Sequence, residues 1–221
     1  HDRFFFRRRF CDFEDHPIFQ KFMLPEFKRT DQKLNASCDQ KFKYIAKHTK
    51  PLVGIIGKGN NGRDVLEAFS NLKKKRNCYV LIANEKIKKS PQYKNLMRKE
   101  KITEIFKASD IPKNAVIIDG IFGTGINKKL PPKVEKLIHK LNKLPNDIIS
   151  IDIPSGLSEI NQETCIKANI TLAMMFPKTI FLDKTKKQNC GRIYVMNFNL
   201  KQSDLRNYQF PIVDNDYILL K

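Results

Sequence analysis

The stretch LVGIIGKGNNGRDV, residues 52–65, decides the fold of this chain. It opens with five apolar or small residues in succession, a run typical of a strand buried on both faces. Gly57, Gly59 and Gly62 follow with the spacing G-x-G-x-x-G, and the apolar residues from Val65 to Leu72 then recur at helical intervals. A strand, a glycine-rich turn and a helix in this order are typical of a unit that binds a phosphate at the helix N-terminus.

The same alternation of apolar runs and amphipathic stretches continues along the chain. Residues 134–141 predict one of the intervening helices, with apolar side chains on one face. Such an alternation predicts an α/β fold, a Rossmann-like three-layer sandwich with a mostly parallel central sheet. The further predicted strands are Cys78–Ile82, Ala115–Ile118, Ile148–Ile151, Ile170–Ala173 and Arg192–Val195.

Glycines and acidic residues gather at the ends of these strands. Seven of the nine glycines follow the first, third and fourth predicted strands. Because ligands bind beyond the carboxyl ends of parallel strands, we expect the three loops to converge on one crevice. Asp119 and Asp152 each end a strand, and together with Asn61 they would supply oxygen ligands to a cation or a base to a substrate. We expect Asp119 to face the crevice, because burying a carboxylate without a partner costs several kcal/mol.

Each of these features also has a purely structural interpretation. The first glycine loop alone is consistent with a tight turn that binds nothing, and Asp119 with a residue that caps a neighbouring turn. Lys178, which follows the strand beginning at Ile170, either points into the crevice or is a solvated surface lysine.

Taken together, three motifs resemble a known family. They are GNNGRD at residues 59–64, DGIFGTG at 119–125 and DIPSG at 152–156. In this order and at these separations they resemble the NAD(P)H-hydrate epimerases, the YjeF N-terminal domain family, from about Leu52 to the C-terminus. The resemblance implies a Rossmann-like metabolite-repair isomerase that interconverts the R and S forms of hydrated NADH and NADPH.

The resemblance also implies a set of site residues. Asp152 would contact the substrate near the reacting ring, and we assign it as the catalytic residue because epimerisation at a hydrated ring carbon needs a proton acceptor and donor within reach. Potassium would be the cofactor, with Asn61, Asp119 and Ser155 as its ligands. The hydrated dinucleotide would contact Asn60, Asn61, Gly62, Arg63, Asp64, Gly123, Thr124, Gly125, Ile126, Asn127, Lys128, Lys129 and Asp152.

Two features depart from the family pattern. Arg63 and Val65 stand where the family's first loop usually has glycines, and Arg63 would either reach a phosphate or obstruct the pocket. The N-terminal helical region of the family, with its Leu-Met-Glu-x-Ala-Gly signature, has no clear counterpart in residues 26–50. Relatives use that helix to cover the active site and to form a dimer, so a homodimer is an open expectation here.

The charge of the chain suggests a second function. Its 42 Lys and Arg residues against 23 Asp and Glu give a net charge of +19, and 12 basic against 3 acidic residues fall between Lys73 and Lys107. Either codon bias toward A and T fills the surface with lysine, or the basic surface meets a polyanion. The alternative is therefore a catalytically degenerate family member that serves as a structural or RNA-contacting subunit of a large ribonucleoprotein such as a mitochondrial ribosome. Its nucleic-acid candidates are Lys73, Lys74, Lys75 and Arg76.

A third alternative is an NAD-dependent dehydrogenase, for which Glu85 lies near the position of a ribose-binding acid. This alternative leaves the second and third glycine loops without a role.

Outside the motifs, the sequence predicts a basic and aromatic N-terminal extension over residues 1–50, with a helix at 40–48, and the YjeF-like domain over 51–221. The extension is rich in Arg and Phe, which favours a mitochondrial over a cytoplasmic location. No apolar run is long enough to cross a membrane, so no membrane partner is expected. The five cysteines form no C-x-x-C pair and predict no structural zinc site.

Overall fold

The computed structural model describes residues 50–70, 77–99, 102–124, 129–158, 164–174, 178–196 and 217–220. Strands and helices alternate along most of these residues. In chain order the elements are β1 (Leu52–Ile56), α4 (Asn60–Ser70), β2 (Cys78–Ile82), η2 (Glu85–Lys89), α5 (Pro91–Lys99), β3 (Ile102–Ile105), η3 (Ala108–Asp110), β4 (Val116–Gly120), α6 (Pro132–Leu141), β5 (Ile148–Ile151), β6 (Ile170–Met174), η4 (Thr179–Leu182), α7 (Lys184–Lys187), β7 (Arg192–Met196) and β8 (Tyr217–Leu220).

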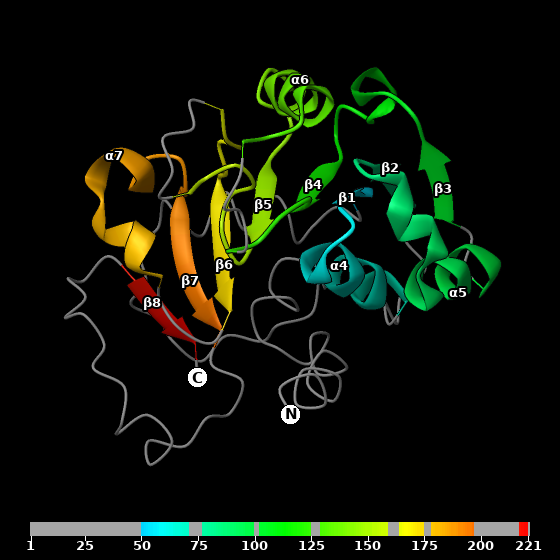
Figure 1. Ribbon diagram of the computed structural model, residues 1–221, viewed down its shortest axis with the longest axis horizontal. Helices are drawn as coiled ribbons and strands as arrows, with labels where there is room; N and C mark the ends of the chain where they lie inside the picture. The colour runs from blue at the N-terminus through cyan, green and yellow to red at the C-terminus, as the bar shows by residue number, and fades with distance from the viewer. Residues whose placement is uncertain are drawn as a thin grey trace, which may run out of the picture.

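The described strands form one sheet in the order β3-β2-β1-β4-β5-β6-β7-β8. Each neighbouring pair runs parallel. Helices cover the sheet on both sides, with α4 and α5 on one side and α6 on the other (Figure 1). The predicted Rossmann-like three-layer sandwich is confirmed.

The sequence of β1 is apolar without interruption because the strand is buried on both faces. Leu52 and Ile56 pack with residues of α4 and α5 in one core cluster. Val53 and Ile55 pack with residues of α6 in another. Because successive side chains of a strand point to opposite faces, a strand between two helical layers needs apolar residues at every position.

The α4 helix lies unusually close to the sheet because two strands carry glycine beneath it. A Cβ at Gly54 would lie 3.0 Å from Val65 Cγ1, and one at Gly120 would lie 2.7 Å from Val65 Cγ2. Val65 is 2% exposed and packs into the core. This β-branched residue therefore packs against the sheet.

The sequence patterns miss two described strands. In β3, Thr103 and Glu104 interrupt the apolar pattern, and the strand pairs only with β2 at one edge of the sheet. An edge strand needs no continuous apolar run, so its signal is weak. β8 is the last strand of the sheet and pairs with β7. The helix predicted at 40–48 and residues 1–49 of the predicted extension lie outside the described residues.

In the part of the chain that the structure describes, no helix has the length and apolar character needed to cross a membrane.

Candidate active site

The strand order places the candidate site where the sheet reverses its direction of growth. β1 has β2 on one side and β4 on the other, although β4 follows β3 in the chain. The helices that follow β1 and β4 therefore lie on opposite sides of the sheet (Figure 1), and this divergence creates the usual ligand position of an open α/β sheet. The loop after β5 lies next to it, because β5 pairs with β4.

Asn61, in the first turn of α4, joins all three loops. Its Nδ2 donates to the carbonyl oxygen of Phe122 at 3.0 Å and to that of Ile151 at 2.8 Å. These two bonds use both hydrogens of the amide, so Oδ1 is left as an acceptor. A Cβ at Gly123 would lie 2.8 Å from Asn61 Oδ1, so only glycine lets the β4 loop approach the amide this closely.

Asp119, near the end of β4, is fully buried and satisfied by donors from the protein. Its Oδ2 accepts hydrogen bonds from Ser150 Oγ and Ser155 N, both at 2.8 Å. Its Oδ1 accepts from Ser155 Oγ at 2.5 Å and from Ile121 N at 3.3 Å. Burial raises the pKa of Asp119, and these hydrogen bonds oppose the rise.

The expectation that Asp119 faces the crevice is therefore wrong. We based it on the cost of burying a carboxylate without partners, but four donors from three residues offset that cost here. The structural interpretation, in which Asp119 organises neighbouring turns, matches the observed contacts.

Ser155 connects the loop after β5 to the loop after β4. Its Oγ donates to Asp119 and accepts from Phe122 N at 2.9 Å. The side chain is fully buried. Gly156 follows with φ of 94°, and a Cβ there would lie 2.4 Å from the carbonyl oxygen of Thr164, so this turn requires glycine.

Asp152 has a strained backbone. Its φ is 71°, the sole positive value among the described residues other than glycine. Ile153 N donates to Ile151 O at 3.0 Å, so Asp152 is the central residue of a three-residue γ-turn of the rarer, strained kind. Such strain costs on the order of 1–3 kcal/mol and clusters at functional sites. The turn is held in place because Asp152 N donates to Leu172 O of β6 at 2.8 Å.

The two oxygens of the Asp152 carboxylate have different surroundings. Oδ1 lies 2.9 Å from the ammonium of Lys178, whereas Oδ2 accepts from Thr124 N across 3.4 Å. Asp152 is 8% exposed. A carboxylate with one oxygen held by a cation and the other by a long hydrogen bond is suited to accept or return a proton.

Most glycines of the first loop serve the backbone rather than a ligand. A Cβ at Gly57 would lie 1.8 Å from Ile121 O, and one at Gly62 would lie 2.2 Å from Gly57 O. At Gly59 a Cβ would meet nothing within 4 Å. Gly57 is thus required by the close approach of the loop after β4, Gly62 is required by the tight turn of its own loop, and the backbone at Gly59 borders open space.

The other predicted substrate contacts differ in their surroundings. Asp64 is half-buried. Gly125, Ile126, Asn127 and Lys128 lie outside the described residues, as do the nucleic-acid candidates Lys73, Lys74, Lys75 and Arg76, so those predictions stay predictions. The predicted contacts that are exposed are Asn60, Arg63, Thr124 and Lys129.

Sequence reasoning missed Ser150 and left the role of Lys178 open. Ser150 is the one polar residue in the otherwise apolar strand IISI and lies in register with Asp119. A hydroxyl inside a strand buried on both faces signals a buried polar partner. Glu85, the acid proposed for a dehydrogenase, instead lies 3.0 Å from Lys88 in an exposed ion pair.

Comparison with known proteins identifies the family. The family described as YjeF-related protein N-terminus matches residues 32–180. The chain belongs to this family. A protein of Weissella koreensis named NAD(P)H-hydrate epimerase is 26% identical over 170 residues, which cover 73% of this chain and 76% of the relative.

Two further relatives carry the same name. The protein of Elusimicrobium minutum is 31% identical over 166 residues, covering 68% of this chain and 74% of the relative. That of Oenococcus oeni is 22% identical over 196 residues, covering 86% and 93%. The similarity of this YjeF-related chain to these proteins thus extends over most of each aligned chain.

Proposed function

We propose that this protein is an NAD(P)H-hydrate epimerase, an isomerase that interconverts the R and S forms of hydrated NADH and NADPH. The observation that carries the proposal is the convergence of three loops at the β1–β4 divergence, with Asp152 in a strained turn beside them. The names of the relatives support the same activity.

Asp152 would act as the acid/base group. Epimerisation changes the configuration at the hydrated ring carbon, and this requires a group that accepts a proton and later returns one. Oδ2 suits this role because its only partner among the described residues is Thr124 N, at 3.4 Å. The strained turn fixes the direction in which the carboxylate leaves the backbone.

The first turn of α4 would bind the dinucleotide phosphates. The free N–H groups at a helix N-terminus attract anions, and α4 begins at Asn60 directly after the open backbone of Gly59. Arg63 is exposed in the same turn and has the donors to bind a phosphate. Its side chain would therefore aid binding rather than obstruct it.

The donor set around Asn61 fits a potassium ion. Asn61 Oδ1 and the Ser155 hydroxyl are oxygens, and the Phe122 backbone contacts both residues. The buried Asp119 carboxylate already accepts four hydrogen bonds and would orient the Ser155 hydroxyl rather than bind the ion. Hard cations prefer such neutral and carboxylate oxygens. A bound potassium ion would supply positive charge beside the dinucleotide phosphates.

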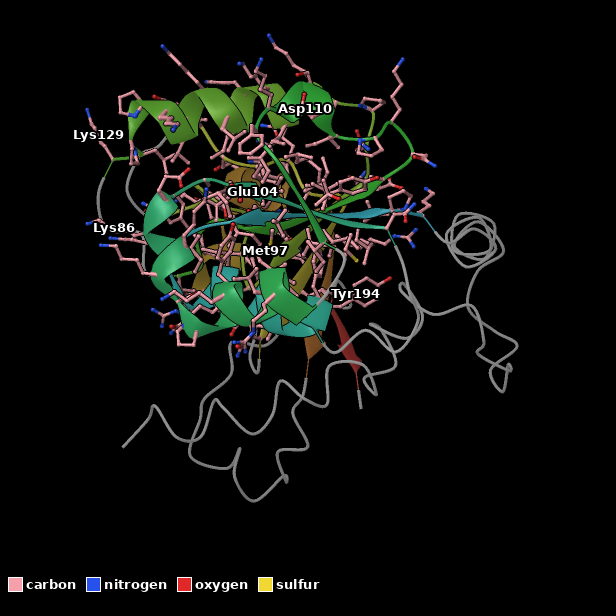
Figure 2. All side chains as sticks on the ribbon, turned by 90° about the vertical axis from the view of Figure 1, so that its right-hand side faces the viewer. Lys86, Met97, Glu104, Asp110, Lys129 and Tyr194 are labelled. Carbon is pink, nitrogen blue, oxygen red and sulfur yellow. The ribbon has the colours of Figure 1, made fainter. Side chains whose placement is uncertain are left out.

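A coupled assay tests the function. The protein is given R-hydrated NADH, potassium chloride and an excess of a dehydratase specific for the S form, and the absorbance of restored NADH is followed. We expect recovery faster than the spontaneous epimerisation, and we expect Asp152→Asn to abolish the gain. The matched control is Asp110→Asn, which changes an exposed carboxylate of η3 that is labelled in Figure 2.

Recovery at the spontaneous rate with the wild-type protein would refute the function. A fully active Asp152→Asn variant would refute the assignment of the acid/base group alone. Replacing potassium by choline tests the cation, because a rate that does not change would exclude a role for it.

A further inference from the structure

Lys178 is placed between two groups that fix its ammonium. It immediately precedes η4, and its Nζ donates to the carbonyl oxygen of Met174, at the end of β6, across 3.0 Å. The same Nζ lies 2.9 Å from Asp152 Oδ1. A lysine held at two points has given up much of the freedom that surface lysines keep.

The ion pair is partly shielded from water. The side chain of Lys178 is 23% exposed and that of Asp152 is 11% exposed. Exposed ion pairs contribute about 0–1 kcal/mol to stability, but removing one partner of a buried pair leaves an uncompensated charge. The position of Asp152 therefore depends on the cation beside it.

The pairing also makes the two carboxylate oxygens unequal. Oδ1 is engaged by Lys178, and the strained turn at Asp152 restricts the main chain from which the carboxylate extends. Oδ2 keeps a hydrogen bond of 3.4 Å from Thr124 N, on the side of the β4 loop. Lys178 thus selects which oxygen is turned toward the candidate active site.

We infer that Lys178 is a positioning residue that holds Oδ1 of Asp152 so that Oδ2 meets the hydrated ring of the substrate. The inference rests on the proposed epimerase function. It differs from a merely structural role, in which Lys178 would only connect β6 to η4 and its loss would lower stability without a specific effect on turnover.

Steady-state kinetics of the full chain separate the two roles. Lys178→Met removes the charge, and we expect kcat to fall at least tenfold while KM stays within about twofold, since the phosphate contacts lie elsewhere. Lys178→Arg keeps a cation and should recover most of kcat. The matched control is Lys186→Met, which removes a lysine of α7 that has similar exposure and is paired with Asp183.

Three kinetic outcomes would overturn the inference. They are an unchanged kcat in Lys178→Met, a rise in KM alone, and equal losses in the Met and Arg variants. Melting temperatures of all variants are measured alongside, and a loss of activity that matches the unfolded fraction would also overturn it.

A double-mutant cycle tests the pair without any activity. Asp152→Asn, Lys178→Met and the double variant are unfolded in urea, and we expect their changes in stability to be non-additive. Additive changes would overturn the inference. If wild-type protein shows no epimerase activity, the proposed function fails, and the cycle still reports whether Lys178 holds Asp152.

Discussion

The side-chain amide of Asn61 donates a 2.8 Å hydrogen bond to the carbonyl oxygen of Ile151, 90 residues later in the chain. The bond ties the first turn of α4 to the end of β5, directly before the strained residue Asp152. With its second bond to Phe122, Asn61 fixes three loops against one another. The amide of Asn61 is therefore one of the groups that set the geometry of the candidate site.

Replacing Asn61 should weaken both the fold and the site. Asn61→Ala leaves the carbonyl oxygens of Phe122 and Ile151 without this donor, which costs about 1–3 kcal/mol for a buried group. Urea unfolding measures the loss, and Asn95→Ala, on the exposed surface of α5, is the control. Equal stability of the two variants would show that the amide does not hold the loops together.

The first glycine loop offers a matched pair of substitutions. Gly57→Ala places a Cβ 1.8 Å from Ile121 O, so the two loops must separate, and we expect a loss of at least 3 kcal/mol, roughly the upper range for single substitutions. Gly59→Ala meets nothing within 4 Å and should change stability by less than about 1 kcal/mol. Thermal unfolding of both variants compares them directly, and similar losses would contradict the close approach of the loops.

The strain at Asp152 predicts an order of stability among variants that all lack the carboxylate. Glycine tolerates a φ of 71°, asparagine does so better than most residues, and alanine does not. We therefore expect Asp152→Gly and Asp152→Asn to be more stable than Asp152→Ala, the glycine variant by about 1–2 kcal/mol. Urea unfolding of the three proteins checks the order, and an alanine variant as stable as the glycine variant would argue against strain.

The carboxylate of Glu104 in β3 predicts a pH-dependent part of the stability. Burial alone would raise the pKa of Glu104, but hydrogen bonds from Lys88 and Tyr93 outweigh it and hold the pKa below its usual value. Lys88 Nζ lies 2.7 Å and Tyr93 Oη 2.5 Å from the carboxylate.

Because the folded pKa of Glu104 is lower than the unfolded one, its contribution is present above the unfolded pKa and is lost as pH falls through the folded pKa. Glu104→Gln should therefore lower the free energy of unfolding near neutral pH. The difference in the free energy of unfolding between neutral and acidic pH should be smaller in this variant than in the wild type. Urea unfolding of both proteins from about pH 3 to pH 7, where carboxyl groups titrate, measures this difference. If the stability of the variant depended on pH as that of the wild type does, Glu104 would not contribute to the pH dependence of stability.

Residue patterns predicted the central part of the sheet well and its edges poorly. The apolar runs of β1, β2, β4, β5, β6 and β7 identify these strands because both of their faces are covered. β3 carries Glu104 and Thr103, since an edge strand is only partly covered, and its pattern is ambiguous.

The sequence predicted that the three loops meet, but not the contacts between their side chains. Asn61, Asp119, Asp152 and Ser155 do come together at the carboxyl ends of the strands. The prediction that Asp119 faces the crevice failed because the donors that satisfy it come from Ser150 and Ser155, more than 30 residues away in the chain.

By itself, the sequence determined the layered α/β architecture and the order of the three glycine-containing loops. Those properties follow from local features, namely which faces of a strand are covered and where the chain must turn. Tertiary structure alone decided that Asp119 is buried, that Lys178 pairs with Asp152 and that Val65 packs on the sheet. These contacts depend on strand register and on how closely α4 approaches Gly54 and Gly120, and close packing between distant segments sets such distances.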